Sequence, residues 1–149
     1  PLQLLQCDVR GKKIIHATSS GTRGIANAIH ADVVMTGSFV NAEAIAHFIR
    51  KNRPEHVSLV CMGYACEYPT DEDTLCAEYI RNLLTGEESD LESMKKQIRN
   101  GSGARFFEEA SQEWAPSGDF ELCLQVNKFN FVLKVVREEN LTLLEKTEI

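Results

Sequence analysis

Between Lys13 and Leu84, short apolar runs alternate three times with helical patterns, and this alternation constrains the fold more than any other feature. The apolar runs are Lys13–Ala17, Asp32–Thr36 and Val57–Met62. Their length and composition are typical of short buried strands. Strands that alternate with helices predict a parallel sheet that is covered on both faces.

Each apolar run leads into a predicted helix, and the three helices span Thr22–Ile29, Asn41–Lys51 and Asp71–Leu84. The second ends before Pro54, and Gly86 stops the third. Further helices are predicted at Glu87–Asn100, Ala104–Trp114 and Asp119–Asn127, and a terminal hairpin at Phe131–Val136 and Leu141–Leu144. The predicted fold is one α/β domain over residues 1–149. It has a three-layer α/β/α arrangement with a largely parallel sheet, and a C-terminal hairpin.

Charge, hydropathy and the Cys and His content limit the classes of partner, compartment and metal that the chain suits. The net charge is −6 and no Lys/Arg-rich run occurs, which argues against a nucleic-acid partner. No apolar stretch reaches membrane-spanning length, so no membrane association is expected. The five cysteines form no CxxC pair and suggest free thiols in a reducing, cytoplasmic compartment. The four histidines lack metal-ligand spacing, which argues against zinc.

The loops after the predicted strands are expected to converge, because ligands bind beyond the carboxyl ends of parallel strands. These loops are Thr18–Gly21, Gly37–Asn41 and Gly63–Asp73. The first is rich in hydroxyls and opens a helix, so its amides and the fork of Arg23 suit an anion. Its candidate substrate-binding residues are Ser19, Ser20, Gly21, Thr22 and Arg23. The alternative is a Ser/Thr cap followed by a surface arginine.

Two other loops hold polar residues whose roles the sequence leaves open. Ser38 and Asn41 either cap the second helix or bind substrate. The acidic triplet Asp71–Asp73 either caps the third helix and complements its dipole or forms a site. Acids opposite an anion loop make sense with Mg²⁺ between them, because the metal neutralises phosphate charge. A nucleophilic Cys66 is a weaker alternative, since no basic residue or imidazole lies near it in the sequence.

Four segments in order resemble the 2-phosphosulfolactate phosphatase family of coenzyme M biosynthesis. The first, Thr18-Ser-Ser-Gly-Thr-Arg23, resembles the family's Thr-Thr-Asn-Gly-Thr-Arg loop, and Gly37-Ser-Phe-Val-Asn-Ala42 resembles its Gly-Ser-hydrophobic-Asn-Ala segment. Glu72-Asp-Thr-Leu-Cys76 resembles its acid-Asp-x-x-Cys helix start, and Asp119-Phe-Glu-Leu-Cys123 its Asp-Phe-Glu-x-Cys helix. Each segment alone is weak, but four at suitable separations are a fairly specific signal.

The resemblance implies a Mg²⁺-dependent phosphatase that hydrolyses 2-phosphosulfolactate, or another small phosphorylated sulfonate or carboxylate. Arg23 would hold an anionic group, beside the amides of Gly21 and Thr22. Asp73 and Glu72 would be metal ligands or acid/base groups. Asp119 would cap its helix.

Two departures from the family pattern bear on this expectation. Ser20 stands where the family has Asn. Family members also carry upstream acidic motifs, so the chain resembles the C-terminal portion of a member and begins at the Pro of an Asn-Ser-Pro stretch. The alternative function is therefore a non-catalytic anion-binding or assembly module derived from this family. Exposed strand edges also make a homodimer a reasonable expectation.

Overall fold

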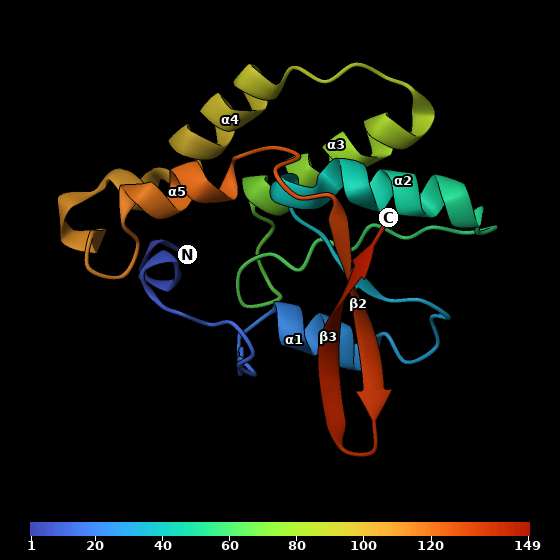
Figure 1. Cartoon of the computed structure of the whole chain (residues 1–149). Coiled ribbons are helices and arrows are strands. Elements are labelled where there is room, and N and C mark those ends of the chain that lie inside the picture. The colour runs from blue at the N-terminus through green and yellow to red at the C-terminus, as the bar shows by residue number, and fades with distance from the viewer.

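Four of the five α-helices gather on one side of the molecule, and a long β-hairpin extends from them (Figure 1). The computed structural model describes all residues from Pro1 to Ile149. Its α-helices are α1 (Gly21–Asn27), α2 (Ala42–Asn52), α3 (Asp71–Thr85), α4 (Leu91–Asn100) and α5 (Ser117–Cys123). Its strands are β1 (Met35–Thr36), β2 (Phe131–Glu138) and β3 (Leu141–Glu148). Short 3₁₀ turns lie at Leu2–Gln6, Phe39–Asn41, Ala104–Phe107 and Glu109–Ser111.

The single sheet is antiparallel, in the order β1-β2-β3. Met35 is paired with Lys134, and the hairpin register runs from Phe131 opposite Glu148 to Glu138 opposite Leu141. The structure is thus a mixture of helix and sheet, as predicted, and the predicted terminal hairpin is confirmed. The prediction of a three-layer α/β/α fold with a largely parallel sheet is wrong.

The parallel sheet is absent because two of its three expected strands do not form. Residues 13–17 and 57–62 are neither helix nor strand, and the run at 32–36 contributes only the two residues of β1. A strand is stable only when a neighbour pairs with its backbone and covers its side chains. Here Ile15 is 97% exposed and Val60 is 74% exposed. The apolar pattern therefore predicts strands whose neighbours this chain does not supply.

The three helices predicted before Gly86 are all present. Their ends follow the expected signals: α3 stops at Gly86, which adopts the left-handed conformation (φ +81°) that glycine tolerates. The left-handed C-cap of α2 is Arg53, just before Pro54. Arg137 ties α1 to the hairpin, because its guanidinium donates to the carbonyls of Ile25 and Ala28 at 2.8 and 3.3 Å.

Beyond Gly86 the helices are shorter than predicted. The expected helix from Glu87 begins only at Leu91, because the Asp90 carboxylate accepts the amide of Ser93 and caps it there. The expected helix over residues 104–114 is instead two 3₁₀ turns. The last helix, α5, ends at Cys123 and not at Asn127.

The core lies mainly among the helices, and Val132 of β2 also belongs to it. Its centre is the contact between α2 and α3, where Ile45, Ile49 and Ile80 are buried. Aromatic rings extend it on both sides: Phe39 stacks on Tyr79 with centroids 6.0 Å apart, and other rings surround Phe120. This core fixes the N-terminal end of α3, which carries the acidic triplet. No helix of the chain has the length and apolar character needed to cross a membrane.

Candidate functional site

Two of the three loops expected to converge do meet. The amide of Cys66 donates to the hydroxyl of Ser20 at 3.2 Å, which joins the loop before α1 to the loop before α3. Next to this bond, Met62 packs against α1 so closely that a Cβ at Gly24 would overlap its sulfur. Ser20 is buried by these contacts. The junction brings the predicted anion loop to the connection that leads into the acidic triplet.

The loop before α3 is a tight turn with strained backbone. The amide of Glu67 donates to the carbonyl of Tyr64 at 3.1 Å, and between them Ala65 and Cys66 have φ angles of +56° and +61°. Left-handed backbone at non-glycine residues costs of order 1–3 kcal/mol each and tends to occur at functional sites. Gly63 (φ +62°) precedes the turn, where a Cβ would overlap the carbonyl oxygen of Tyr68.

The predicted anion loop leaves its arginine free. The Thr22 amide donates to the Thr18 hydroxyl at 3.3 Å, and the Thr22 hydroxyl donates back to the Thr18 carbonyl at 2.7 Å. Ser19, Thr22 and Arg23 are exposed, and the Arg23 guanidinium makes no hydrogen bond or ion pair within the chain. The Arg23 guanidinium is therefore exposed to solvent and free to bind a phosphate, sulfonate or carboxylate.

The acids of the triplet divide between two different partners. Asp73 accepts the amide of Gly63 at 2.7 Å through Oδ2, so it holds the start of the strained loop. Glu72 forms an ion pair with Arg105 at 3.2 Å and also accepts the Ser102 hydroxyl. Adjacent residues of a helix point about 100° apart, which explains why Glu72 and Asp73 do not share a partner.

Asp71 has a structural role at the start of α3. Its carboxylate accepts the Ser102 amide at 3.0 Å and the Gln97 side-chain amide at 3.1 Å. The hydrogen bond from the Ser102 backbone, followed by the one from Gln97, lowers the pKa of Asp71 below its usual value. Together with Glu72, Asp71 thus fastens α3 to the connection that follows α4.

The residues present do not by themselves fit a magnesium ion. No group of three His, Cys, Asp or Glu side chains has a metal-binding arrangement. Glu72 is engaged by Arg105 and Ser102, and Asp73 by Gly63. A metal site at these two acids would require both to change partners and further oxygen ligands to be supplied.

Ser38 and Asn41 act as a helix cap in the structure. The Asn41 side-chain oxygen accepts from the Ser38 amide at 3.2 Å and from its hydroxyl at 3.0 Å, which completes a capping box. The Asn41 amide group also donates to the carbonyl of Phe131 at 3.3 Å. No hydrogen bond joins these two residues to the other two loops.

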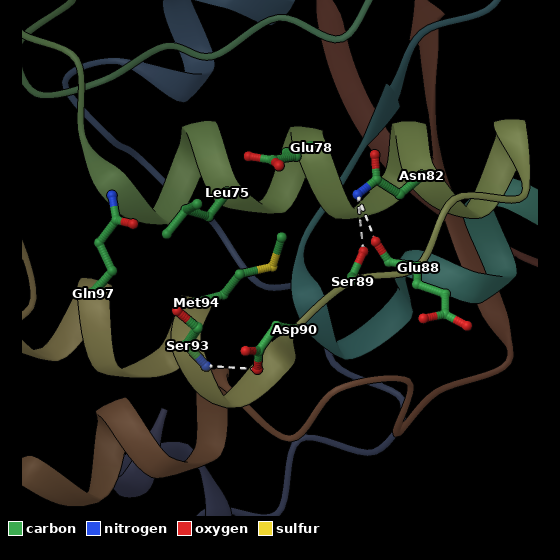
Figure 2. Close-up of a pocket in the computed structure, with 9 residues that line it drawn as sticks. All are labelled: Leu75, Glu78, Asn82, Glu88, Ser89, Asp90, Ser93, Met94 and Gln97. Atoms are coloured by element: carbon green, nitrogen blue, oxygen red, sulfur yellow. Dashed lines mark hydrogen bonds between the residues drawn. The ribbon is translucent and has the colours of Figure 1, made fainter.

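A pocket of about 240 Å³ lies elsewhere, between α3 and α4 (Figure 2). Its polar groups largely satisfy one another: the Asn82 side chain donates to the Ser89 hydroxyl at 3.0 Å, and Asp90 accepts the Ser93 amide. None of the site residues predicted from the sequence lines it. This pocket offers no arrangement of reactive groups.

The structure adds contacts that sequence reasoning missed, and they involve four residues, Gly63, Cys66, Ser102 and Arg105. Gly63 and Cys66 contribute backbone amides to Asp73 and Ser20, and a backbone contribution leaves no side-chain signal. Ser102 and Arg105 engage Glu72 from a connection about 30 residues further along the chain. Only the Gly101–Gly103 turn hinted at this contact, because glycines on both sides of Ser102 allow close backbone approach.

Cys76 is expected to resist alkylation in the folded chain. Burial, with a smaller contribution from Asp73, raises the pKa of its thiol to about 12. Since the thiolate is the nucleophile, only about one molecule in ten thousand is reactive at pH 8. Mass spectrometry after iodoacetamide treatment should show modification of exposed Cys7 at least about a hundredfold faster, with Cys76 reacting only after unfolding. Similar rates for the two thiols would contradict the placement of Cys76 in the core.

Comparison with known proteins identifies the family. The family model described as 2-phosphosulpholactate phosphatase matches residues 1–138. A match of that extent covers both loops and the acidic triplet. The chain therefore belongs to the 2-phosphosulfolactate phosphatase family, and the resemblance seen in its motifs is confirmed.

Curated relatives carry the same name but are longer. A "Probable 2-phosphosulfolactate phosphatase" of Caldanaerobacter subterraneus is 30% identical over 91% of this chain and 60% of its own. Proteins of that name from Thermosynechococcus vestitus and Gloeobacter violaceus are 33% and 36% identical, over 36% and 38% of their own lengths. The chain thus spans between about a third and three fifths of these relatives. No solved structure matches it significantly.

Proposed function

We propose that a protein containing these residues hydrolyses a phosphate monoester, with 2-phosphosulfolactate as substrate and sulfolactate and phosphate as products. The observation that carries this proposal is the family match over residues 1–138, together with the names of the relatives. In the reaction, water forms a new bond to phosphorus, the bond from phosphorus to the substrate oxygen breaks, and that oxygen receives a proton.

The first step assigned to this chain is anion binding by the loop before α1. Arg23 supports it because its guanidinium is exposed and unpaired, and a bidentate fork matches phosphate or sulfonate oxygens. Ser19, Ser20, Gly21 and Thr22 would line the same anion. In phosphoryl transfer such a fork stabilises the negative charge spread over the phosphoryl oxygens. Ser38 and Asn41 are further candidates, but binding would require them to give up their capping box.

The second step assigned to this chain is proton handling at the start of α3. Asp73 is the better candidate, because its carboxylate accepts only the Gly63 amide and lies beside the loop that contacts Ser20. Glu72 is the second candidate, at present paired with Arg105. When bound, Mg²⁺ would neutralise phosphate charge. The acids as they stand do not form its site, so the steps proposed here use only side chains of this chain.

Replacement of Arg23 by Lys tests the anion site. Lysine keeps the charge but loses the planar fork, so KM for 2-phosphosulfolactate should rise about tenfold with a smaller change in kcat. The measurement is phosphate release by an active protein that contains these residues. Arg53→Lys is the matched control, since Arg53 is also exposed and its side chain forms no hydrogen bond or ion pair. An unchanged KM for Arg23→Lys would contradict the assignment, and no turnover of 2-phosphosulfolactate by the unmodified protein would contradict the function.

The second candidate function is a non-catalytic module that binds an anion or takes part in an assembly. The observation in its favour is that Glu72 and Asp73 already have partners within the chain. Binding of 2-phosphosulfolactate without phosphate release, in a protein of the relatives' full length, would favour the module over the phosphatase.

Two broader expectations also stay proposals. A cytoplasmic location is supported by the five cysteines, which are all free thiols, the usual state in a reducing compartment. A homodimer is supported by the exposed apolar side chains of β3, Leu141 and Leu144, at the edge of the sheet.

A further inference from the structure

Two apolar runs of the chain have unpaired backbones. Residues 13–17 and 57–62 make no backbone hydrogen bond to each other or to any other segment. Figure 1 draws both as plain coil, the first in blue and the second in green. Backbone amides and carbonyls in folded proteins are nearly always paired, and those without a protein partner rely on water.

Most side chains of these runs are exposed as well, although Leu59 packs against the core and Met62 packs against α1. Ile14 and Ile15 are 60% and 97% exposed, and Val60 is 74% exposed. Such a segment exposes unpaired backbone N–H and C=O groups together with apolar side chains, as an unpaired edge strand does. Stable proteins cover such edges. The exposure therefore indicates strands that lack a partner and not ordinary surface loops.

The far ends of the two runs are held together. Residues 13–17 lead directly into the loop that contains Ser20, and residues 57–62 lead into the turn that contains Cys66. The hydrogen bond from the Cys66 amide to the Ser20 hydroxyl, 3.2 Å long, joins these exits. Both runs therefore approach the candidate site with the same chain direction, as neighbouring strands of a parallel sheet do.

The strands that the chain does form leave the runs uncovered. The sheet uses β1, β2 and β3 in a single antiparallel order, and β1 contributes two residues. The largest buried cluster lies mainly between helices, with Val132 of β2 as its one strand residue. No strand of this chain pairs with residues 13–17 or 57–62 in the structure, so a strand from other polypeptide is free to do so.

The length of the relatives indicates what that polypeptide is. The Caldanaerobacter relative aligns with 91% of this chain, yet two fifths of the relative lies outside the match. A typical strand needs only five or six residues. We propose that residues 13–17 and 57–62 are β-strands whose partner is the portion of the family's chain that lies outside these 149 residues, and that this pairing completes the sheet behind the candidate site. The proposal rests on family membership and not on the proposed reaction.

Hydrogen exchange followed by mass spectrometry tests the pairing on intact proteins. In the 149-residue chain, amides of both runs should exchange quickly while those of α2 and α3 are protected. In the intact Caldanaerobacter relative, the aligned amides should exchange at least about a hundredfold more slowly. Fast exchange in both proteins would overturn the proposal. Slow exchange in the 149-residue chain alone would also overturn the proposal. Light scattering would then show whether the runs pair within a monomer or with a second copy of the chain.

A charged substitution gives an independent measurement. Ile15→Lys should leave the thermal midpoint of this chain unchanged, because the side chain is already exposed. Lysine at the aligned position of the intact relative should lower the midpoint by at least about 5 °C, because there it would enter a covered strand. Ile29→Lys, at an exposed apolar residue just after α1, is the matched control in both proteins. Equal effects of Ile15→Lys in the two proteins would overturn the proposal, whatever the outcome of the phosphatase assays.

Discussion

Asp73→Asn is expected to lower the phosphatase turnover of an active protein that contains these residues by at least about a hundredfold. Removal of the charge abolishes proton transfer by a carboxylate at this position. The fold should survive, because the asparagine oxygen can still accept the Gly63 amide that Asp73 accepts at 2.7 Å. The measurement is phosphate release in the presence of Mg²⁺, with urea unfolding followed in parallel.

Glu78→Gln is the matched control for Asp73→Asn. Glu78 lies on the same helix, α3, is partly exposed and has no assigned role, so its replacement removes one charge without touching the site. Turnover should stay within about twofold of the parent protein, as for most surface substitutions. Near-normal turnover of the Asp73→Asn variant, with an unchanged unfolding midpoint, would remove Asp73 from the catalytic assignment.

The helices could be predicted because their signals are local. The predicted third helix, Asp71–Leu84, differs from α3 by one residue, since the acidic first turn and Gly86 mark its two ends. The prediction over residues 104–114 was wrong, because those residues pack by short 3₁₀ turns around Phe120. Tertiary contacts determine the secondary structure of that segment, and a local sequence pattern carries no information about those contacts.

The sheet could not be predicted in the same way, because a strand depends on its neighbours. The hairpin was predictable, since β2 and β3 are adjacent in sequence and joined by a short turn at Glu139, which has a left-handed φ of +47°. The apolar runs at 13–17 and 57–62 have the composition of strands but find no partner within the chain. An apolar pattern reports what a segment can form and not whether its neighbour is present.

The candidate site was predictable in its location more than in its contacts. Loop convergence follows from the alternating pattern, and the bond between Ser20 and Cys66 fits that expectation for two of the three loops. The separation of Glu72 from Asp73 depends on Arg105, which lies 33 residues away and carries no local signal. The catalytic, substrate-binding and metal roles of these residues stay predictions.

The 149-residue chain by itself is expected to fold and to show little or no phosphatase activity. Folding is supported by the helical core, in which α2 packs against α3 and the rings of Phe39 and Tyr79 stack. Urea unfolding followed by circular dichroism should therefore give a cooperative transition. A noncooperative transition would contradict the core described above.

Little turnover is expected from the chain alone because catalytic groups must be held within about 0.5 Å of a productive geometry. In this chain Glu72 is held by Arg105 and Ser102, Asp73 by Gly63, and Arg23 contacts neither acid. The assay adds Mg²⁺ and 2-phosphosulfolactate, or a generic phosphate monoester, to the purified chain and measures released phosphate beside a relative of full length. We expect at least about a hundredfold lower kcat/KM for the chain. Equal turnover would instead mean that all essential groups lie between Pro1 and Ile149, and would assign the chemistry to Arg23, Glu72 and Asp73.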